Sequence, residues 1–185
     1  MDSRASPWGY LECPEWAGRL MLIAGRLARL VGGKVVLDLN CGSAPLLHYL
    51  PRTFLRYVGN DIDAMALQAA RLACPLAEFL ECPDDALPNL GQVDILLCLG
   101  YAAALNCRES QTLDASVRQV VIEYCPEMVV LDVWMGVPVY PDFVALVLWI
   151  GQQGYAPSGW LVSPLSAVDD RQRRAVYFLE RVGSR

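Results

Sequence analysis

The sequence predicts an α/β fold in which buried parallel strands alternate with helices. Short apolar runs recur along the chain, and two early runs each end at an acidic residue. Segments in which apolar residues recur at helical spacing separate these runs. A turn of small residues follows the first run, as expected where a central strand leaves a sheet toward a helix.

Length and composition indicate one compact domain. With 185 residues, of which 55% are hydrophobic, the chain can bury a full core but has no room for a second one. We divide it into residues 1–32, an N-terminal segment and helix expected to act as a lid, and residues 33–185, which carry the sheet. No apolar stretch reaches membrane-spanning length and the first residues lack a signal peptide, so we expect a cytoplasmic protein.

Apolar spacing and boundary residues predict the elements of the first half. They are a helix over 15–31, a strand over 35–39, a helix opening at Pro45, a strand over 57–61, a helix capped by Asp63 that runs to Cys74, and a strand over 78–81. Gly32-Gly33 ends the first helix. Pro45 suits a first helical turn, because its fixed φ fits the helix and its missing N–H has no partner there.

The second half predicts further strands and helices, ending in a pair of strands. These elements are a strand over 93–100, a helix over 112–124, a strand over 128–134, a helix from Pro141 to about Gly151, and strands over 159–163 and 174–181. Only about ten residues separate the strands at 78–81 and 93–100, so we expect a short crossover between them.

The most informative segment runs from Val35 to Ala44 and is followed by the strand that ends at Asp61. The apolar strand carries Asp38 near its end and continues into the small-residue turn Asn40-Cys41-Gly42-Ser43-Ala44. A carboxylate such as Asp61 at the next strand end can accept both hydroxyls of a ribose. The two pieces together predict a site for a cofactor that bears a nucleoside.

These residues resemble the first two motifs of the class I S-adenosylmethionine (SAM)-dependent methyltransferases. Their first motif reads apolar-apolar-acid-x-Gly-x-Gly-x-Gly, which Asp38 and Gly42 match, whereas Asn40 and Ala44 replace the first and third glycines. Asparagine tolerates the backbone conformation of glycine better than most residues. Asp61 matches the acid of the second motif. The resemblance extends over about residues 33–181.

The resemblance implies a three-layer Rossmann-like sandwich. Its sheet would have seven mostly parallel strands in the order 3-2-1-4-5-7-6, with strand 7 antiparallel. It also implies SAM as the cofactor and an acid after strand three at the adenine, and either Asp84 or Asp85 can be that acid. The residues then expected to bind the cofactor are Asp38, Asn40, Cys41, Gly42, Ala44, Asp61, Ile62, Asp84, Asp85 and Leu99.

The substrate side is expected just past strands four and five. Candidate catalytic residues are Tyr101 and Asp132, and candidate substrate-binding residues are Trp134, Tyr140 and Trp16. An alternative role for Asp132 is to anchor the end of its strand. Because a sulfonium already makes its methyl group electrophilic, a catalytic base is optional.

The sequence favours a small organic molecule as methyl acceptor. After Leu99 the chain lacks the Asn/Asp-Pro-Pro-aromatic run of the amine-methylating DNA enzymes, so we expect no DNA substrate. A net charge of −5 disfavours RNA, although two clusters of arginine keep an RNA-directed enzyme open as an alternative. We interpret those arginines as solvated charges; they are Arg19, Arg26, Arg29, Arg171, Arg173 and Arg174.

The sequence also bears on two other classes of function and on a metal site. A binding or scaffold domain without catalysis stays open because two motif glycines are replaced. A nicotinamide-dependent oxidoreductase is disfavoured, because Asp38 would lie near the pyrophosphate and Gly-x-Gly-x-x-Gly is missing. Seven scattered cysteines and one histidine predict neither a zinc site nor a disulfide framework, so no metal is expected.

Overall fold

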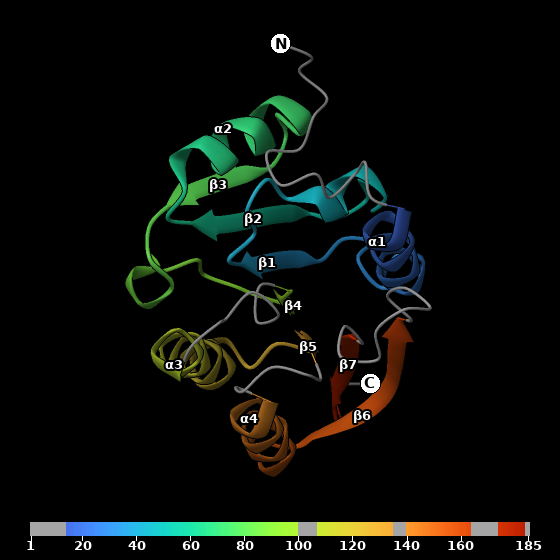
Figure 1. Cartoon of the computed structure of the whole chain (residues 1–185), viewed down its shortest axis with the longest axis vertical. Coiled ribbons are helices and arrows are strands. Elements are labelled where there is room, and N and C mark those ends of the chain that lie inside the picture. The colour runs from blue at the N-terminus through green and yellow to red at the C-terminus, as the bar shows by residue number, and fades with distance from the viewer. Residues whose placement is uncertain (1–13, 100–106, 135–139, 164–173, 184–185) are drawn as a thin grey trace.

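The computed structural model describes residues 14–99, 107–134, 140–163 and 174–183, with a seven-stranded sheet between two layers of helices (Figure 1). The strand order is β3-β2-β1-β4-β5-β7-β6. The strands are β1 (Val35–Leu39), β2 (Arg56–Asp61), β3 (Glu78–Glu81), β4 (Ile95–Cys98), β5 (Met128–Trp134), β6 (Tyr155–Ser163) and β7 (Arg174–Arg181). The predicted fold class and strand order are confirmed.

Strand direction defines the two edges of the sheet that matter for function. The pairs β1·β2, β2·β3, β1·β4 and β4·β5 are parallel, whereas β7 is antiparallel to both β5 and β6. The carboxyl ends of β1 to β5 therefore lie together, and we call this the carboxyl edge. The opposite side, where these strands begin, is the amino edge.

Helices cover both faces of the sheet. They are α1 (Pro14–Leu27), α2 (Ala64–Ala73), α3 (Cys107–Tyr124) and α4 (Tyr140–Gln152), with short 3₁₀ helices η1 (Pro45–His48) and η2 (Asp84–Ala86). Successive strand residues point to opposite faces. Leu37 and Leu39 of β1 therefore pack with α3 and α4, while Val36 packs with α1, η1 and α2.

Several boundaries differ from the sequence prediction. Pro45 opens only a 3₁₀ helix of four residues. Pro51 follows closely and disfavours a helical conformation at the residue before it, so a longer helix has no room. The first helix ends at Leu27 and not at Val31, and β6 begins four residues early, at Tyr155. Asp63 caps α2 as predicted, because its side chain accepts hydrogen bonds from the N–H groups of Met65 and Ala66.

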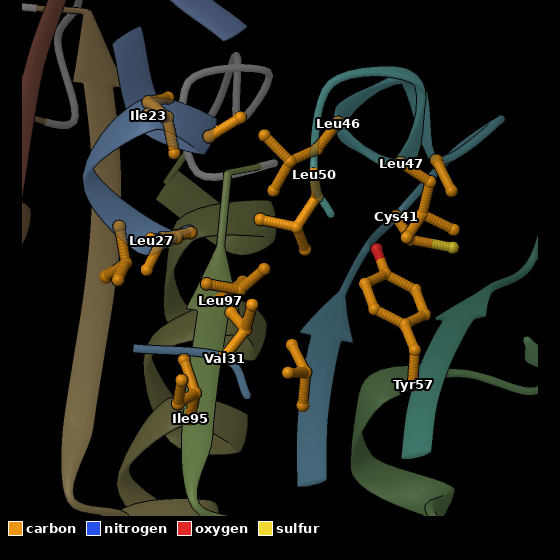
Figure 2. Close-up of a cluster of buried hydrophobic side chains, with 14 of the residues drawn as sticks. Ile23, Leu27, Val31, Cys41, Leu46, Leu47, Leu50, Tyr57, Ile95 and Leu97 are labelled. Carbon is orange, nitrogen blue, oxygen red and sulfur yellow. The ribbon is translucent and has the colours of Figure 1, made fainter. Parts of the chain in front are cut away.

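Helix α1 is part of the core. Leu20, Ile23 and Leu27 are almost completely buried in the cluster that Figure 2 draws. The segment before Pro14 lies outside the described residues, so a lid formed there stays a prediction. Within the described ranges, no helix has both the length and the apolar character needed to cross a membrane.

Candidate functional site

The turn after β1 has an unusual backbone. Asn40, Gly42 and Ala44 have φ values of 58°, 55° and 50°, in the left-handed region that favours glycine. Asn40 and Ala44 thus adopt the conformation expected of the glycines that they replace. Apart from its two chain neighbours, no described residue has an atom within 4 Å of a β-carbon added to Gly42, so the backbone of this turn borders open space.

Strand β2 holds this turn in place. The Cys41 N–H donates to the Asn60 carbonyl at 2.9 Å, and the Ala44 N–H donates to the Cys41 carbonyl at 2.8 Å. The Cys41 side chain is buried against Gly59, where an added β-carbon would lie 2.7 Å from Sγ. Burial raises the pKa of the Cys41 thiol well above its usual value, so this side chain acts as a small neutral packing group.

Asp61 lies directly against the turn. Its Oδ2 accepts the Gly42 N–H at 2.7 Å, and its Oδ1 accepts the Asp63 N–H at 2.9 Å. The residue is 9% exposed, so water has little access to it. Each carboxylate oxygen can accept a further hydrogen bond, which leaves room for the two hydroxyls of a ribose.

Asp38 is a buried acid on the same side of the sheet. The Tyr57 hydroxyl donates a hydrogen bond to its Oδ2. Burial raises the pKa of Asp38 to about 7, and the charge of Asp61 acts in the same direction. A carboxyl group with this pKa can change its protonation state when a cation binds beside it.

The structure separates the two acids that follow β3. The Asn60 side-chain amide donates to Oδ1 of Asp84 at 2.7 Å. Asp84 is half-buried, and burial raises its pKa, with Asp61 adding to the shift. Asp85 is exposed. Asp84 is therefore the acid that lies toward the site.

Asn60 is a site residue that the sequence analysis missed. It is completely buried at the end of β2, and its Oδ1 has no hydrogen-bond partner among the described residues. A polar side chain inside an apolar strand, directly before the motif acid, was the available signal. Next to it, Ile62 is 72% exposed and Leu99 is half-buried, so both offer apolar surface at the carboxyl edge.

The site fits a nucleoside that carries a positive charge. Among the described residues, no lysine or arginine forms an ion pair with Asp38, Asp61 or Asp84. Buried carboxylates without a cation are costly. SAM has a ribose for Asp61, an adenine for Asp84 and Ile62, and a positively charged methionine end, so these residues fit it.

The predicted catalytic residue Asp132 lies in a different environment. It is completely buried at the end of β5, and its Oδ2 forms ion pairs with Nη1 of Arg19 and, at 3.3 Å, with Nη1 of Arg174. These contacts join α1, β5 and β7, which favours the anchoring alternative for Asp132. Tyr101 lies outside the described residues, as do the side chains of Trp134, Tyr140 and Trp16.

The interpretation of the arginines as solvated charges is wrong for three of the six. Arg19 and Arg174 are buried with Asp132. Arg26 stacks on the Phe178 ring at 4.6 Å and donates to the Ser158 carbonyl at 2.6 Å. Arg29 is exposed as expected, and Arg171 and Arg173 lie outside the described residues.

Comparisons with known proteins place the chain by its fold. No family model matches the sequence, and no curated protein matches it either. The N-methyltransferase NodS from Bradyrhizobium japonicum, in complex with S-adenosylhomocysteine (SAH), is similar in structure. The TM-score is 0.73 at 11% identity, over 96% of this chain and 92% of NodS.

Two further methyltransferase structures are also similar to this chain in their fold. Magnesium protoporphyrin IX methyltransferase from Synechocystis with bound SAM has a TM-score of 0.69 at 13% identity, over 90% of this chain and 80% of that one. The methyltransferase domain of bacterial CtHen1 has a TM-score of 0.67 at 15% identity, over 88% of this chain and 96% of that one. This chain therefore has the fold of the class I SAM-dependent methyltransferases.

Proposed function

We propose that this protein is a SAM-dependent methyltransferase that transfers a methyl group to a small organic molecule. The observation that carries the proposal is the contact between the Gly42 N–H and the Asp61 carboxylate at the carboxyl edge. It brings the turn after β1 and the acid that ends β2 together beside open space. The fold and the bound ligands of NodS and the magnesium protoporphyrin enzyme support the same cofactor.

Each polar group of the site has a proposed partner on the cofactor. Asp61 binds the ribose hydroxyls, Asp84 binds the adenine amino group, and Ile62 packs against the adenine ring. Asp38 and the turn at Asn40 to Ala44 receive the methionine end. When bound, the cofactor supplies an electrophilic methyl group, so the protein has to hold the acceptor in line and exclude water.

The substrate side is proposed to lie next to β4 and β5. Tyr101, Trp134, Tyr140 and Trp16 are the residues that we propose for it. A small molecule is favoured over RNA, because Arg19 and Arg174 are buried with Asp132 and Arg26 is held by Ser158, so these arginines are engaged within the protein. The acid Asp132, held by two arginines, is proposed to fix the end of β5 beside this region.

Calorimetric titration with SAH tests the cofactor site. We expect the wild type to bind SAH, and Asp61→Ala to weaken binding at least about 100-fold, since it removes hydrogen bonds from a charged acceptor. Asp61→Asn keeps the shape and an acceptor oxygen, and we expect an intermediate loss. Glu78→Ala is the control, because it removes an acid that is exposed and paired at the amino edge. Equal affinity of Asp61→Ala and Glu78→Ala would rule out the site.

Methyl transfer distinguishes the proposed activity from its alternatives. Purified protein is incubated with SAM carrying a radioactive methyl group and with separate small-molecule and RNA fractions of a cell extract. Label in the small-molecule fraction supports the proposal, and label in RNA would replace it with an RNA-directed enzyme. SAH binding with no transfer to either fraction would indicate a binding domain without catalysis.

A further inference from the structure

The hydrogen bond from Tyr57 to Asp38 has no role in the proposed function as described so far. Asp38 is 3% exposed and Tyr57 is 1% exposed, and they lie on neighbouring strands. Figure 2 shows the Tyr57 ring rising from β2, with its hydroxyl pointing toward the turn that carries Cys41. A buried tyrosine normally needs a partner for its hydroxyl, but a backbone carbonyl would serve as well as a carboxylate.

Among the described contacts, only one carboxylate oxygen of Asp38 accepts a hydrogen bond. Tyr57 donates to Oδ2, whereas Oδ1 is buried and has no hydrogen-bond partner among the described residues. An unsatisfied buried carboxylate oxygen is costly, so a structure that keeps one has a reason for it. Asp38 also lies two residues before Asn40, which begins the turn where we place the methionine end of the cofactor.

We propose that Tyr57 is a positioning residue: its hydroxyl occupies Oδ2 of Asp38 and so presents Oδ1 to the ammonium group of the cofactor's methionine end. This inference rests on the proposed function. It also requires that Asp38 be ionised when the cofactor is bound, because a protonated carboxyl group carries no charge for the ammonium group. In the free protein at acidic pH, the proton on Asp38 therefore leaves to the buffer as the cofactor binds.

The surroundings of Asp38 favour this proton release. Its pKa is raised to about 7, first by burial and then by Asp61, while the bond from Tyr57 acts against the rise. The other titratable groups here are the Cys41 thiol in the turn and Cys74 after α2, and burial keeps the Cys41 thiol neutral. On the other side, Asp38 pairs in register with Leu97 of β4, which is apolar.

The test is calorimetric titration with SAH, which has the same ammonium group, in two buffers of different ionisation enthalpy. The difference in heat gives the number of protons released. We expect the wild type to release close to one proton at about pH 6 and almost none at about pH 8. Its affinity should fall about tenfold per pH unit below pH 7.

Tyr57→Phe has a distinct expected result. Without the hydroxyl the pKa of Asp38 rises further, so proton release should persist at about pH 8, and affinity at about pH 7 should fall about 10-fold or more. Tyr155→Phe is the matched control. Its hydroxyl is also buried, and it donates to the Pro126 carbonyl at 2.6 Å, on the amino edge. We expect this variant to lose stability but keep the wild-type proton count.

Three outcomes would overturn the inference. One is a wild type that binds SAH with no proton release at about pH 6. Another is a Tyr57→Phe variant with the same pH midpoint as Tyr155→Phe, which would make the hydroxyl merely structural. If Tyr57→Phe does not fold, Asp38→Asn replaces it, and continued proton release in that variant would contradict the role of Asp38. A wild type that binds no SAH would instead overturn the proposed function itself.

Discussion

At the amino edge of the sheet, Glu127 and Glu78 are paired with cationic side chains. Glu127 accepts two hydrogen bonds from Nζ of Lys34, at 2.6 and 2.8 Å. Glu78 accepts two from the guanidinium of Arg56, at 2.8 and 2.6 Å, which lowers the pKa of Glu78. Asp94 accepts the Val35 N–H at 2.7 Å, as part of the connection between β1 and β4.

At the carboxyl edge of β1 to β3, by contrast, the acidic residues are not paired with cations in the described ranges. Within the part of the chain that the structure describes, Asp38, Asp61 and Asp84 have only neutral donors, namely the Tyr57 hydroxyl, backbone N–H groups and the Asn60 amide. Burial raises the pKa of Asp38 and of Asp84. The ion pairs of the amino edge stabilise the free protein, whereas the buried acids of the carboxyl edge cost stability, and a positively charged ligand would supply the charge that they lack.

Asp132 also lies at the carboxyl edge, but it forms ion pairs with two arginines. Its two arginine partners come from α1 and β7, outside the proposed cofactor half of the site. Position at the carboxyl edge therefore does not by itself make an acid functional. The absence of a cationic partner distinguishes the proposed cofactor acids from the anchoring acid.

The largest expected effect is at Asp132. Asp132→Asn removes the buried carboxylate that Arg19 and Arg174 share, and we expect a loss of about 3–5 kcal/mol in the free energy of unfolding. Urea denaturation measures it. The control is Glu127→Gln, which breaks an exposed pair at the amino edge. A loss at Asp132 no larger than that of the control would show that this cluster does not anchor β5.

Asp38→Asn should stabilise the free protein at alkaline pH. Folded Asp38 keeps its proton up to about pH 7, but the unfolded residue loses it near 3.8, so stability falls as pH rises between these values. Asparagine removes this loss, and we expect a gain of about 1–3 kcal/mol at about pH 8 together with weakened SAH binding. Urea denaturation at about pH 5 and about pH 8 checks the sign. A gain that does not grow with pH would contradict it.

Gly59→Ala tests how closely β2 must approach the turn. The new β-carbon would lie 2.7 Å from Sγ of Cys41 and 3.1 Å from Phe79, so we expect a loss of about 1–3 kcal/mol. Adding Cys41→Ala should recover part of it in a double-mutant cycle. Gly25→Ala, in an open position on α1, is expected to be neutral or stabilising. Additive losses in the cycle would show that the sulfur is not the obstacle.

The smallest expected effect is at the exposed pairs of the amino edge. Lys34→Met should cost less than about 1 kcal/mol, because the Lys34 and Glu127 side chains are partly exposed. The loss should shrink further in concentrated salt, which screens the pair. Thermal unfolding at low and high salt measures both. A larger loss that does not depend on salt would mean that this ion pair contributes more to the free energy of unfolding than a partly exposed pair should.

Local patterns predicted most of the fold. The strand over 128–134 and the cap at Asp63 were placed correctly, because apolar runs and capping residues act over a few neighbouring positions. The left-handed backbone conformation of Asn40 also followed from the motif, whereas that of Ala44 is seen only in the structure. The helix predicted from Pro45 is too long, because Pro51 disfavours a helical conformation at Leu50.

The chemistry of the site likewise depends partly on local sequence and partly on tertiary contacts. The sequence by itself determined that acids stand at strand ends beside a turn of small residues, because strand, turn and helix signals are local. Only the tertiary structure decided which acids remain without a cation. Tyr57 donates to Asp38 from the neighbouring strand, and Asn60 donates to Asp84 and not to Asp85. Arg19 and Arg174 pair with Asp132 from distant segments of the chain. Burial and pairing depend on what the folded chain brings into contact, which no run of neighbouring residues specifies.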